Sequence, residues 1–399
     1  MAVQPTGILN EREFMTERKL VLWKCTDGEP IAARIAVGGD FLPAGKLESS
    51  RQNAWDVAAG ALAPYFEDVA TSFVNLECAI DADGLAARKL VGLGDIVSAP
   101  RAALDYLSAI RSAAVGFANN HAYDFGATGV ERTRNALARR NLVLIGAGIR
   151  VTDAPDVWVW QGPGDIRVGF WAAAKASHDV AHGRAAGSEP ATSRRGKEAL
   201  ELLRSQGARF SIALLHAGLL RASRPDPADL KVMDAIAEGG FDIVAASHSH
   251  RIGGSKCMCM YAARGRPAFC FYGLGSLVSG YVASPIEREG LIVVAGLKTD
   301  GSLGSLEVKP VLLAPSGFGE VPSDEAGQTI LHRFQQLSEE IADGSFQKLF
   351  YREISQSIVK LYFRDASAAF RASGLGGLAR KTGRVRLRHL RRLAHGFLP

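Results

Sequence analysis

The stretch AAVGFANNHAYDFG, residues 113–126, decides the fold, because it joins an apolar run to a cluster of polar side chains. Its first six residues form the continuous apolar pattern of a strand that is buried on both faces. Asn119, Asn120 and His121 stand directly where that strand would end, and Asp124 follows closely. Asn tolerates left-handed backbone and often serves in turns, so this segment alone is compatible with a turn or with a site.

The same unit repeats along the chain: an apolar run ends in a short polar cluster, and a helical pattern follows. The runs lie at residues 35–37, 71–74, 113–118, 142–145, 168–171, 210–215, 241–246 and 268–272. Such alternation predicts parallel strands joined by helices. Further on, residues 290–297 and 303–313 predict a β-hairpin around Asp300-Gly301.

Two of the intervening helices have recognisable ends. Thr128, with Glu131 three residues later, predicts a capping box that opens a helix ending near Arg140. An Asp-Pro pair at 226–227 predicts the start of another helix, and a Gly-Gly pair at 239–240 predicts its end.

Polar side chains of metal-ligand type follow five of the predicted strands. Binding sites of open α/β sheets form beyond the carboxyl ends of strands, and four of the nine histidines stand there. The candidate residues are Asp40, Glu77, Asn120, His121, Asp124, His216, His248 and His250. Each alone has an ordinary structural explanation, such as a turn, a surface carboxylate or a buried histidine. Their order and their equivalent positions predict one shared site.

The His248-x-His250 pair is the most specific element of this set after the Asn-Asn-His segment. If the chain is extended there, a period of two places both rings on the same side. Two divalent ions about 3.5–4 Å apart need a shared carboxylate, with imidazole and oxygen ligands in the remaining positions. Mixed nitrogen and oxygen ligands suit Mn, Fe or Zn. The residues therefore predict a two-metal phosphoesterase site, and no organic cofactor is expected.

With these residues assembled, the chain resembles the bacterial CapA family of poly-gamma-glutamate capsule biosynthesis proteins, a branch of the calcineurin-like metallophosphoesterase superfamily. The resemblance covers about residues 33–297. The family's motifs occur in order as Gly39-Asp40, Asn75-Leu76-Glu77, Asn119-Asn120-His121-Ala122-Tyr123-Asp124-Phe125-Gly126, His216, His248-Ser249-His250 and Phe271-Tyr272-Gly273-Leu274-Gly275-Ser276. The resemblance implies a four-layer α/β/β/α sandwich of the metallophosphatase type.

The resemblance also implies a metal-binding role for six residues. Asp40 and His250 would bind the first metal, and Glu77 would be the bridging carboxylate. The superfamily's Asp-x-His has Leu42 in place of the histidine here, so the first site is expected to be the weaker one. The second metal would be held by Asn120, His216 and His248.

Two further residues have implied catalytic roles. His121 would face the substrate, as the proton donor to the leaving oxygen or as an electrostatic stabiliser. Asp124 would orient His121 or a metal ligand.

Composition and the N-terminal sequence predict that the protein is cytoplasmic. Hydrophobic residues make up 47% of the chain, mean hydropathy is +0.04, and no apolar run approaches the roughly 18 residues that span a bilayer. The N-terminus lacks a signal-peptide pattern, and the five loosely spaced cysteines favour reduced thiols. The expected parts are an N-terminal extension at 1–30, the catalytic domain at 31–315, a helical appendage at 316–373 and a basic tail at 374–399.

The positive net charge belongs to the C-terminal tail. Residues 371–399 contain eight Arg or Lys and no acid, which exceeds the net charge of +6 for the whole chain, so a nucleic-acid partner is not expected. Arg alternates with apolar residues in this tail. It could therefore lie on the anionic inner-membrane surface as a peripheral contact, bind a partner or pack on its own domain.

Two weaker features leave alternatives open. Arg194, Arg195 and Lys197 could meet an anionic substrate or form a solvated charge run. His178 and His182 could share a helix face near the site or lie in a solvated loop.

The sequence thus predicts a metal-dependent hydrolase that cleaves a phosphoester in capsule, polysaccharide or poly-gamma-glutamate metabolism. Its expected partner is a phosphorylated or acidic polymer-related substrate. Two alternatives remain. In one, the chain is a non-hydrolytic, metal-binding assembly factor for an acidic polymer. In the other, it hydrolyses gamma-glutamyl amide bonds.

Overall fold

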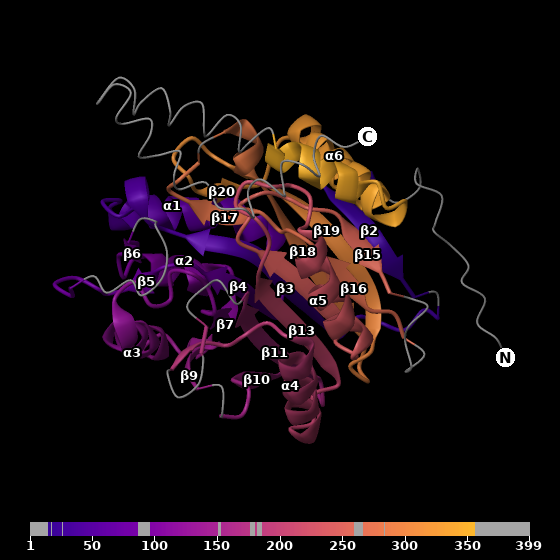
Figure 1. The fold of residues 1–399 in the computed structure, drawn as a ribbon, viewed down its shortest axis with the longest axis horizontal. Coiled ribbons are helices and arrows are strands. Elements are labelled where there is room, and N and C mark those ends of the chain that lie inside the picture. The colour runs from indigo at the N-terminus through magenta and orange to yellow at the C-terminus, as the bar shows by residue number, and fades with distance from the viewer. Residues whose placement is uncertain are drawn as a thin grey trace, which may run out of the picture.

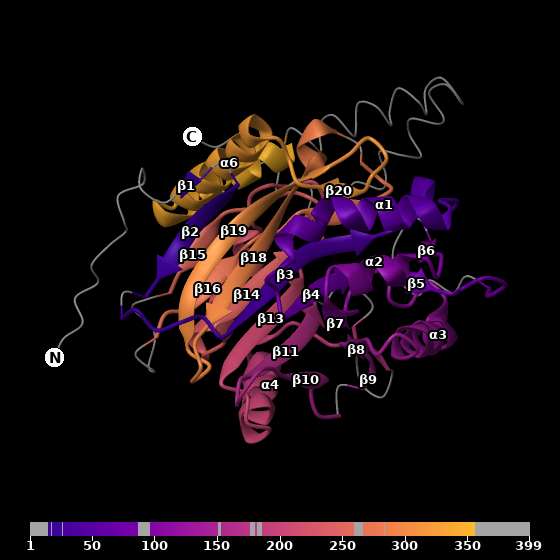
Figure 2. The same ribbon diagram turned by 180° about the vertical axis from the view of Figure 1, so that it is seen from behind.

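Two β-sheets form the centre of the fold, and helices cover their outer faces (Figures 1 and 2). The order of the layers is therefore α/β/β/α, as predicted. The computed structural model describes residues 15–16, 18–25, 27–86, 96–150, 153–175, 180–181, 186–258, 266–282 and 284–355.

The first sheet combines a parallel half with an antiparallel half. Its strand order is β1 (Met15–Thr16), β2 (Lys19–Lys24), β19 (Leu303–Leu313), β18 (Glu289–Leu297), β3 (Ala33–Leu42), β4 (Thr71–Leu76), β7 (Ser112–Gly116) and β8 (Val143–Ile145), with β17 (Ser276–Ser279) paired to β3 and β20 (Gly319–Glu320) paired to β19. Strands β3, β4, β7 and β8 run parallel. Strands β18 and β19 form the predicted hairpin.

The second sheet is parallel at its centre. Its order is β10 (Val157–Gln161), β11 (Arg167–Ala174), β13 (Phe210–His216), β14 (Ile243–Ser247), β16 (Phe269–Phe271) and β15 (Ser255–Cys257), and β11, β13, β14 and β16 run parallel. Two short pairs, β5 (Ala79–Ile80) with β6 (Ser98–Ala99) and β9 (Ala147–Ile149) with β12 (Gly187–Ser188), lie outside the large sheets. Each of the eight predicted apolar runs overlaps a strand, and the runs at 113–118, 142–145, 241–246 and 268–272 extend one or two residues beyond it.

The strands are apolar throughout because each central strand is buried on both faces. Ile35 and Val37 of β3 lie in the core between the sheets, together with Phe170 of β11 and Ile212 of β13. Ala36 of β3 points the other way, into the core beneath the helices. Full burial of such a Val, Ile or Phe side chain contributes about 1.5–3 kcal/mol, so the strands themselves supply much of the stability.

Each sheet has its own helical cover. Helices α1 (Gln52–Leu62), α2 (Ala103–Ala109) and α3 (Gly126–Ala138) pack on the first sheet. Helices α4 (Ser193–Ser205) and α5 (Pro227–Glu238) pack on the second.

The two predicted helix starts have different outcomes. Helix α5 begins as predicted, because the Asp226 side chain accepts a hydrogen bond from the N–H of Ala228 at 3.0 Å. The predicted capping box of α3 is wrong. That helix begins at Gly126, and Thr128 already lies inside it. Gly126 has a φ of +65°, which lets the chain turn directly from the preceding loop into the helix without a side-chain cap.

Helix α6 (Asp324–Ala342) closes one edge of the sandwich, near β2 and the edge strand β15 (Figure 1). Its Ile330, Phe334 and Leu337 enter the core between the two sheets. Strand β2, which lies in the segment predicted as an N-terminal extension, pairs with β19. Segments outside residues 31–315 therefore complete the core instead of standing apart from it.

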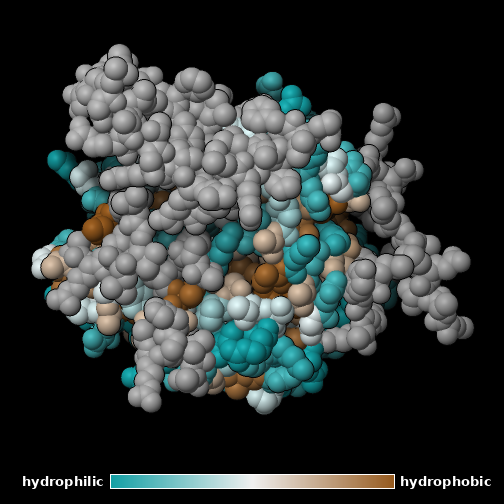
Figure 3. All heavy atoms as spheres, in the orientation of Figure 1, coloured by the Kyte–Doolittle hydropathy of each residue, from teal (hydrophilic) through white to brown (hydrophobic). Residues whose placement is uncertain are grey.

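Arg195 is buried, so neither interpretation of the basic cluster holds for this residue. Its guanidinium makes a two-pronged contact with Glu189, with Nε 2.5 Å from Oε1 and Nη2 2.9 Å from Oε2. Arg194 and Lys197 are exposed on α4, where Figure 3 shows hydrophilic side chains. Glu189 also joins the two sheets, since its N–H bonds the carbonyl of Gly146 and its carbonyl accepts from the N–H of Ala174.

We expect Glu189→Ala to lower the free energy of unfolding by about 3 kcal/mol, the lower end of the cost of breaking a buried ion pair. The variant removes the two-pronged partner of the buried Arg195 guanidinium, whereas the contacts of its Nη1 with Glu198 and with the carbonyl of Asp153 remain. Urea denaturation measures this difference. The exposed Lys197→Ala serves as control and should change the free energy by less than about 0.5 kcal/mol. Equal losses in the two variants would show that the buried pair has no special importance.

The cysteines depart in part from the expected reduced state. Cys25, Cys78 and Cys270 are free thiols, whereas Cys257 is disulfide-bonded. No helix among the described residues has both the length and the apolar character to cross a membrane. His178, His182 and the basic tail at 374–399 lie outside the described residues.

Candidate metal centre

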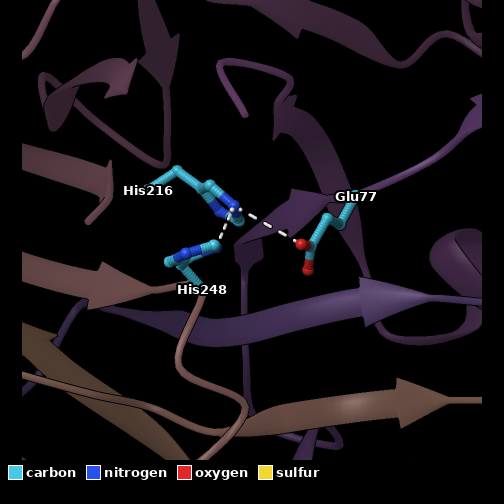
Figure 4. A group of neighbouring side chains, drawn as sticks. All are labelled: Glu77, His216 and His248. Atoms are coloured by element: carbon cyan, nitrogen blue, oxygen red, sulfur yellow. Dashed lines mark hydrogen bonds and ion pairs between the residues drawn. The ribbon is translucent and has the colours of Figure 1, made fainter. Parts of the chain in front are cut away.

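The candidate residues meet where parallel strands of both sheets end. Asp40 lies near the end of β3, and Glu77 directly follows β4. His216 is the last residue of β13, and the His248-Ser-His250 segment directly follows β14. The two sheets present these ends to each other, so groups far apart in the sequence face a common centre (Figure 4).

One group of donor atoms surrounds Nε2 of His216. Nδ1 of His248 lies 3.0 Å from it, and Oε1 of Glu77 lies 3.4 Å from it (Figure 4). Oδ1 of Asn120 lies 2.5 Å from the same nitrogen. A single imidazole N–H can donate to only one of these three atoms. A divalent ion with ligands about 2.0–2.2 Å away separates neighbouring ligand atoms by roughly 3–3.5 Å, so the spacing of His216, His248 and Glu77 fits a metal ion. Asn120 lies closer to His216 than this spacing and would have to move outward to be a ligand.

A second group shares Glu77 with the first. Nδ1 of His250 lies 3.0 Å from Oδ2 of Asp40 and 3.8 Å from Oε2 of Glu77. Glu77 thus directs one carboxylate oxygen toward each group, which is the arrangement that a bridging ligand requires. The Leu42 side chain has no ligand atom to offer this group, and it packs into the core beneath the helices.

Asp40 is held in the ionised state that metal binding requires. Burial alone would raise the pKa of this carboxyl group. The hydrogen bond and charge of His250, the charge of His216 and the backbone N–H of His248 outweigh burial and lower the pKa to about 2. Nδ2 of Asn75 also donates to Oδ1 of Asp40 at 2.7 Å.

Asn75 and Asn119 support the ligands, a role that the sequence interpretation missed. Nδ2 of Asn75 lies 3.1 Å from Nδ1 of His216 as well as contacting Asp40. Asn119 donates from Nδ2 to the side-chain oxygen of Asn75 at 3.2 Å and to the carbonyl of Leu76 at 2.7 Å. A buried amide inside an apolar strand, as at position 75, is the sequence signal that could have revealed this role.

His121 and Asp124 form a pair beside the two groups. Nδ1 of His121 lies 2.7 Å from Oδ2 of Asp124, which also accepts from the N–H of Val97. The backbone N–H of His121 donates to Oδ1 of Asn119. These contacts fix the ring and direct Nδ1 away from solvent. Nε2 is therefore the nitrogen that can exchange a proton with a bound molecule.

The two histidines of the His-x-His segment do not share an extended backbone. His248 has a φ of 102° and His250 has a φ of 54°, so both lie in the left-handed region. Their rings consequently reach different groups, His248 toward His216 and His250 toward Asp40. Such conformations cost about 1–3 kcal/mol each and persist at sites where neighbouring contacts enforce them.

Comparison with known proteins identifies the family. The family model described as "Bacterial capsule synthesis protein PGA_cap" matches residues 34–281, and the chain belongs to this family. This result confirms the resemblance seen in the sequence. No curated protein matches the chain.

Solved structures of similar architecture are distant in sequence. A 5'-nucleotidase precursor from Thermus thermophilus is 13% identical, with a TM-score of 0.44 over 76% of this chain and 58% of that one. The calcineurin-like phosphoesterase YfkN from Bacillus subtilis is 12% identical, with a TM-score of 0.43 over 77% of this chain and 98% of that one. The chain thus spans little more than half of the nucleotidase.

Proposed function

We propose that this chain is a metal-dependent phosphoesterase that acts on a phosphorylated or acidic polymer-related substrate of capsule or poly-gamma-glutamate metabolism. The observation that supports this most directly is the sharing of Glu77 between two donor groups, one with His216, His248 and Asn120, the other with Asp40 and His250. The name of the family supports the capsule connection.

In this proposal some residues bind the metal ions and another donates a proton. Divalent ions held by the two groups would supply Lewis-acid activation of water and of a phosphoryl oxygen. Asp40 and Glu77 contribute negative charge that balances the ions. His121, fixed through Nδ1 by Asp124, donates a proton from Nε2 to the leaving oxygen.

One feature favours a second candidate, a metal-binding assembly factor that does not hydrolyse its polymer. The group around Asp40 contains three candidate ligand residues, since Leu42 occupies the position of a further imidazole. A site that binds one ion firmly could hold carboxylates or phosphates without cleaving them.

An assay with simple substrates separates these candidates. The purified protein with Mn²⁺ should hydrolyse an aryl phosphate monoester or diester, and EDTA should abolish the turnover. Metal-loaded protein that turns over neither ester would favour the assembly factor. Release of glutamate oligomers from poly-gamma-glutamate, without ester cleavage, would instead indicate an amide hydrolase.

A further inference from the structure

A C-terminal helix lies against the loop that follows His216. Within the helical residues 346–355, Phe350 and Ile354 form a small apolar cluster with Ala222 of that loop. Leu219 and Tyr351 pack at its margin. This helix lies beyond residues 34–281, so the matched family region does not contain it.

Glu353 of this helix contacts the loops of both donor groups. Its Oε1 accepts from the backbone N–H of Ser223 at 3.1 Å and from Nη1 of Arg251 at 3.2 Å. Its Oε2 lies 3.4 Å from Nη1 of Arg224. The Glu353 side chain is only 17% exposed, so these contacts are partly shielded from water and salt.

Other acids complete the anchoring of the two arginines. Glu340 of α6 makes a two-pronged contact with Arg224, at 2.7 and 2.8 Å. Glu287 lies 3.7 Å from Nη2 of Arg251. The Arg224 side chain is therefore held by the C-terminal helices, and the Arg251 side chain by Glu353 and by Glu287 of the 285–288 turn.

The loop after His216 and the His-x-His loop both depend on contacts from outside the strands to keep their conformation. Arg251 directly follows His250, whose backbone is in the left-handed region, as is that of His248. The N–H of Arg221 bonds the carbonyl of Ser249, so the loop after His216 and the His-x-His loop are also joined to each other. A displacement of one loop would thus move ligands of both donor groups.

We propose that the helical residues 346–355 hold the metal-binding loops in position, with Glu353 as the central positioning residue. This inference rests on the proposed metal site. Glu353 acts through Arg251 and through the loop around Ser223, which lie between it and the ligands.

The proposal is tested by titrating the full-length, metal-free protein with Mn²⁺ in a calorimeter, which measures the dissociation constant for the metal. Glu353→Ala should weaken Mn²⁺ binding about tenfold, the lower end of the effect seen when residues that support metal ligands are removed. Glu353→Gln keeps an acceptor for the Ser223 N–H but loses the negative charge, so its loss should be smaller. Glu339→Ala removes an exposed acid of α6 and should leave binding unchanged.

Thermal unfolding of the metal-free variants distinguishes positioning from general stabilisation. If Glu353→Ala lowers the Tm but binds Mn²⁺ as tightly as the wild type, the helix is only a structural support and the proposal is wrong. If Glu353→Ala does not fold, the same comparison applies to Glu353→Gln. If the wild type itself binds no Mn²⁺, the proposed metal site fails, and this inference fails with it.

Discussion

Wild-type protein loaded with Mn²⁺ should retain two equivalents of metal, and His248→Ala should retain one or none. His248 supplies Nδ1 to the group around His216, where three other donor atoms remain. Asp40→Asn should have a comparable effect on the other group, because the amide lacks the charge that a carboxylate offers to a cation. Elemental analysis of the protein after removal of free metal measures both effects.

An exposed histidine provides the control for this experiment. His332 lies on α6 and faces solvent, so His332→Ala should keep the wild-type metal content. Wild-type protein that contains no metal after supplementation would contradict the metal centre as a whole. A single equivalent in the wild type would instead assign occupancy to the group with His216, since the group with Asp40 has fewer ligands.

His121→Ala should lower kcat for an aryl phosphate by about 10²–10⁴-fold while the metal content stays at two equivalents. The reason is that Nε2 of His121 protonates the leaving oxygen in the proposed reaction, and no ligand atom is removed. Asp124→Asn should also lower kcat, because Asp124 fixes the His121 ring through Nδ1. Steady-state kinetics with metal-saturated protein measures these changes.

The basicity of the leaving group sharpens this second prediction. A phenolate leaving group needs protonation more than a nitrophenolate does, so His121→Ala should lose more activity with phenyl phosphate than with nitrophenyl phosphate. Equal losses with the two esters would assign His121 to electrostatic stabilisation. Unchanged activity with both esters would exclude His121 from the reaction.

The strands and the site could be predicted because their signals are local. A run such as residues 210–215 followed by His216 contains both the strand and its ligand, and parallel strands bring such ends together. The order of the motifs then defined the family. The positions of the donor atoms, and therefore the sharing of Glu77, required the three-dimensional structure.

The errors concern side-chain orientations, details of backbone geometry and contacts between distant residues. Arg195 belongs to a basic cluster in the sequence, and nothing in that cluster shows that its side chain turns inward to Glu189, six residues earlier. The left-handed backbone of His248 and His250 has no signal in their residue types, since Gly and Asn are the usual residues there. The role of α6 in the core was missed because helical periodicity shows which face is apolar and not what that face contacts.

Strand β3 pairs with β18, which is synthesised much later. Gly38 of β3 pairs with Ile292 of β18, which leaves the ribosome ~250 residues later, or about 12–50 s at 5–20 residues per second. Through that interval the strand that carries Asp40 has an open edge on one side, where other chains could pair with it. The metal centre is therefore expected to form late in synthesis. Because the edge of β3 stays open until then, nascent chains are expected to aggregate more readily than the completed protein.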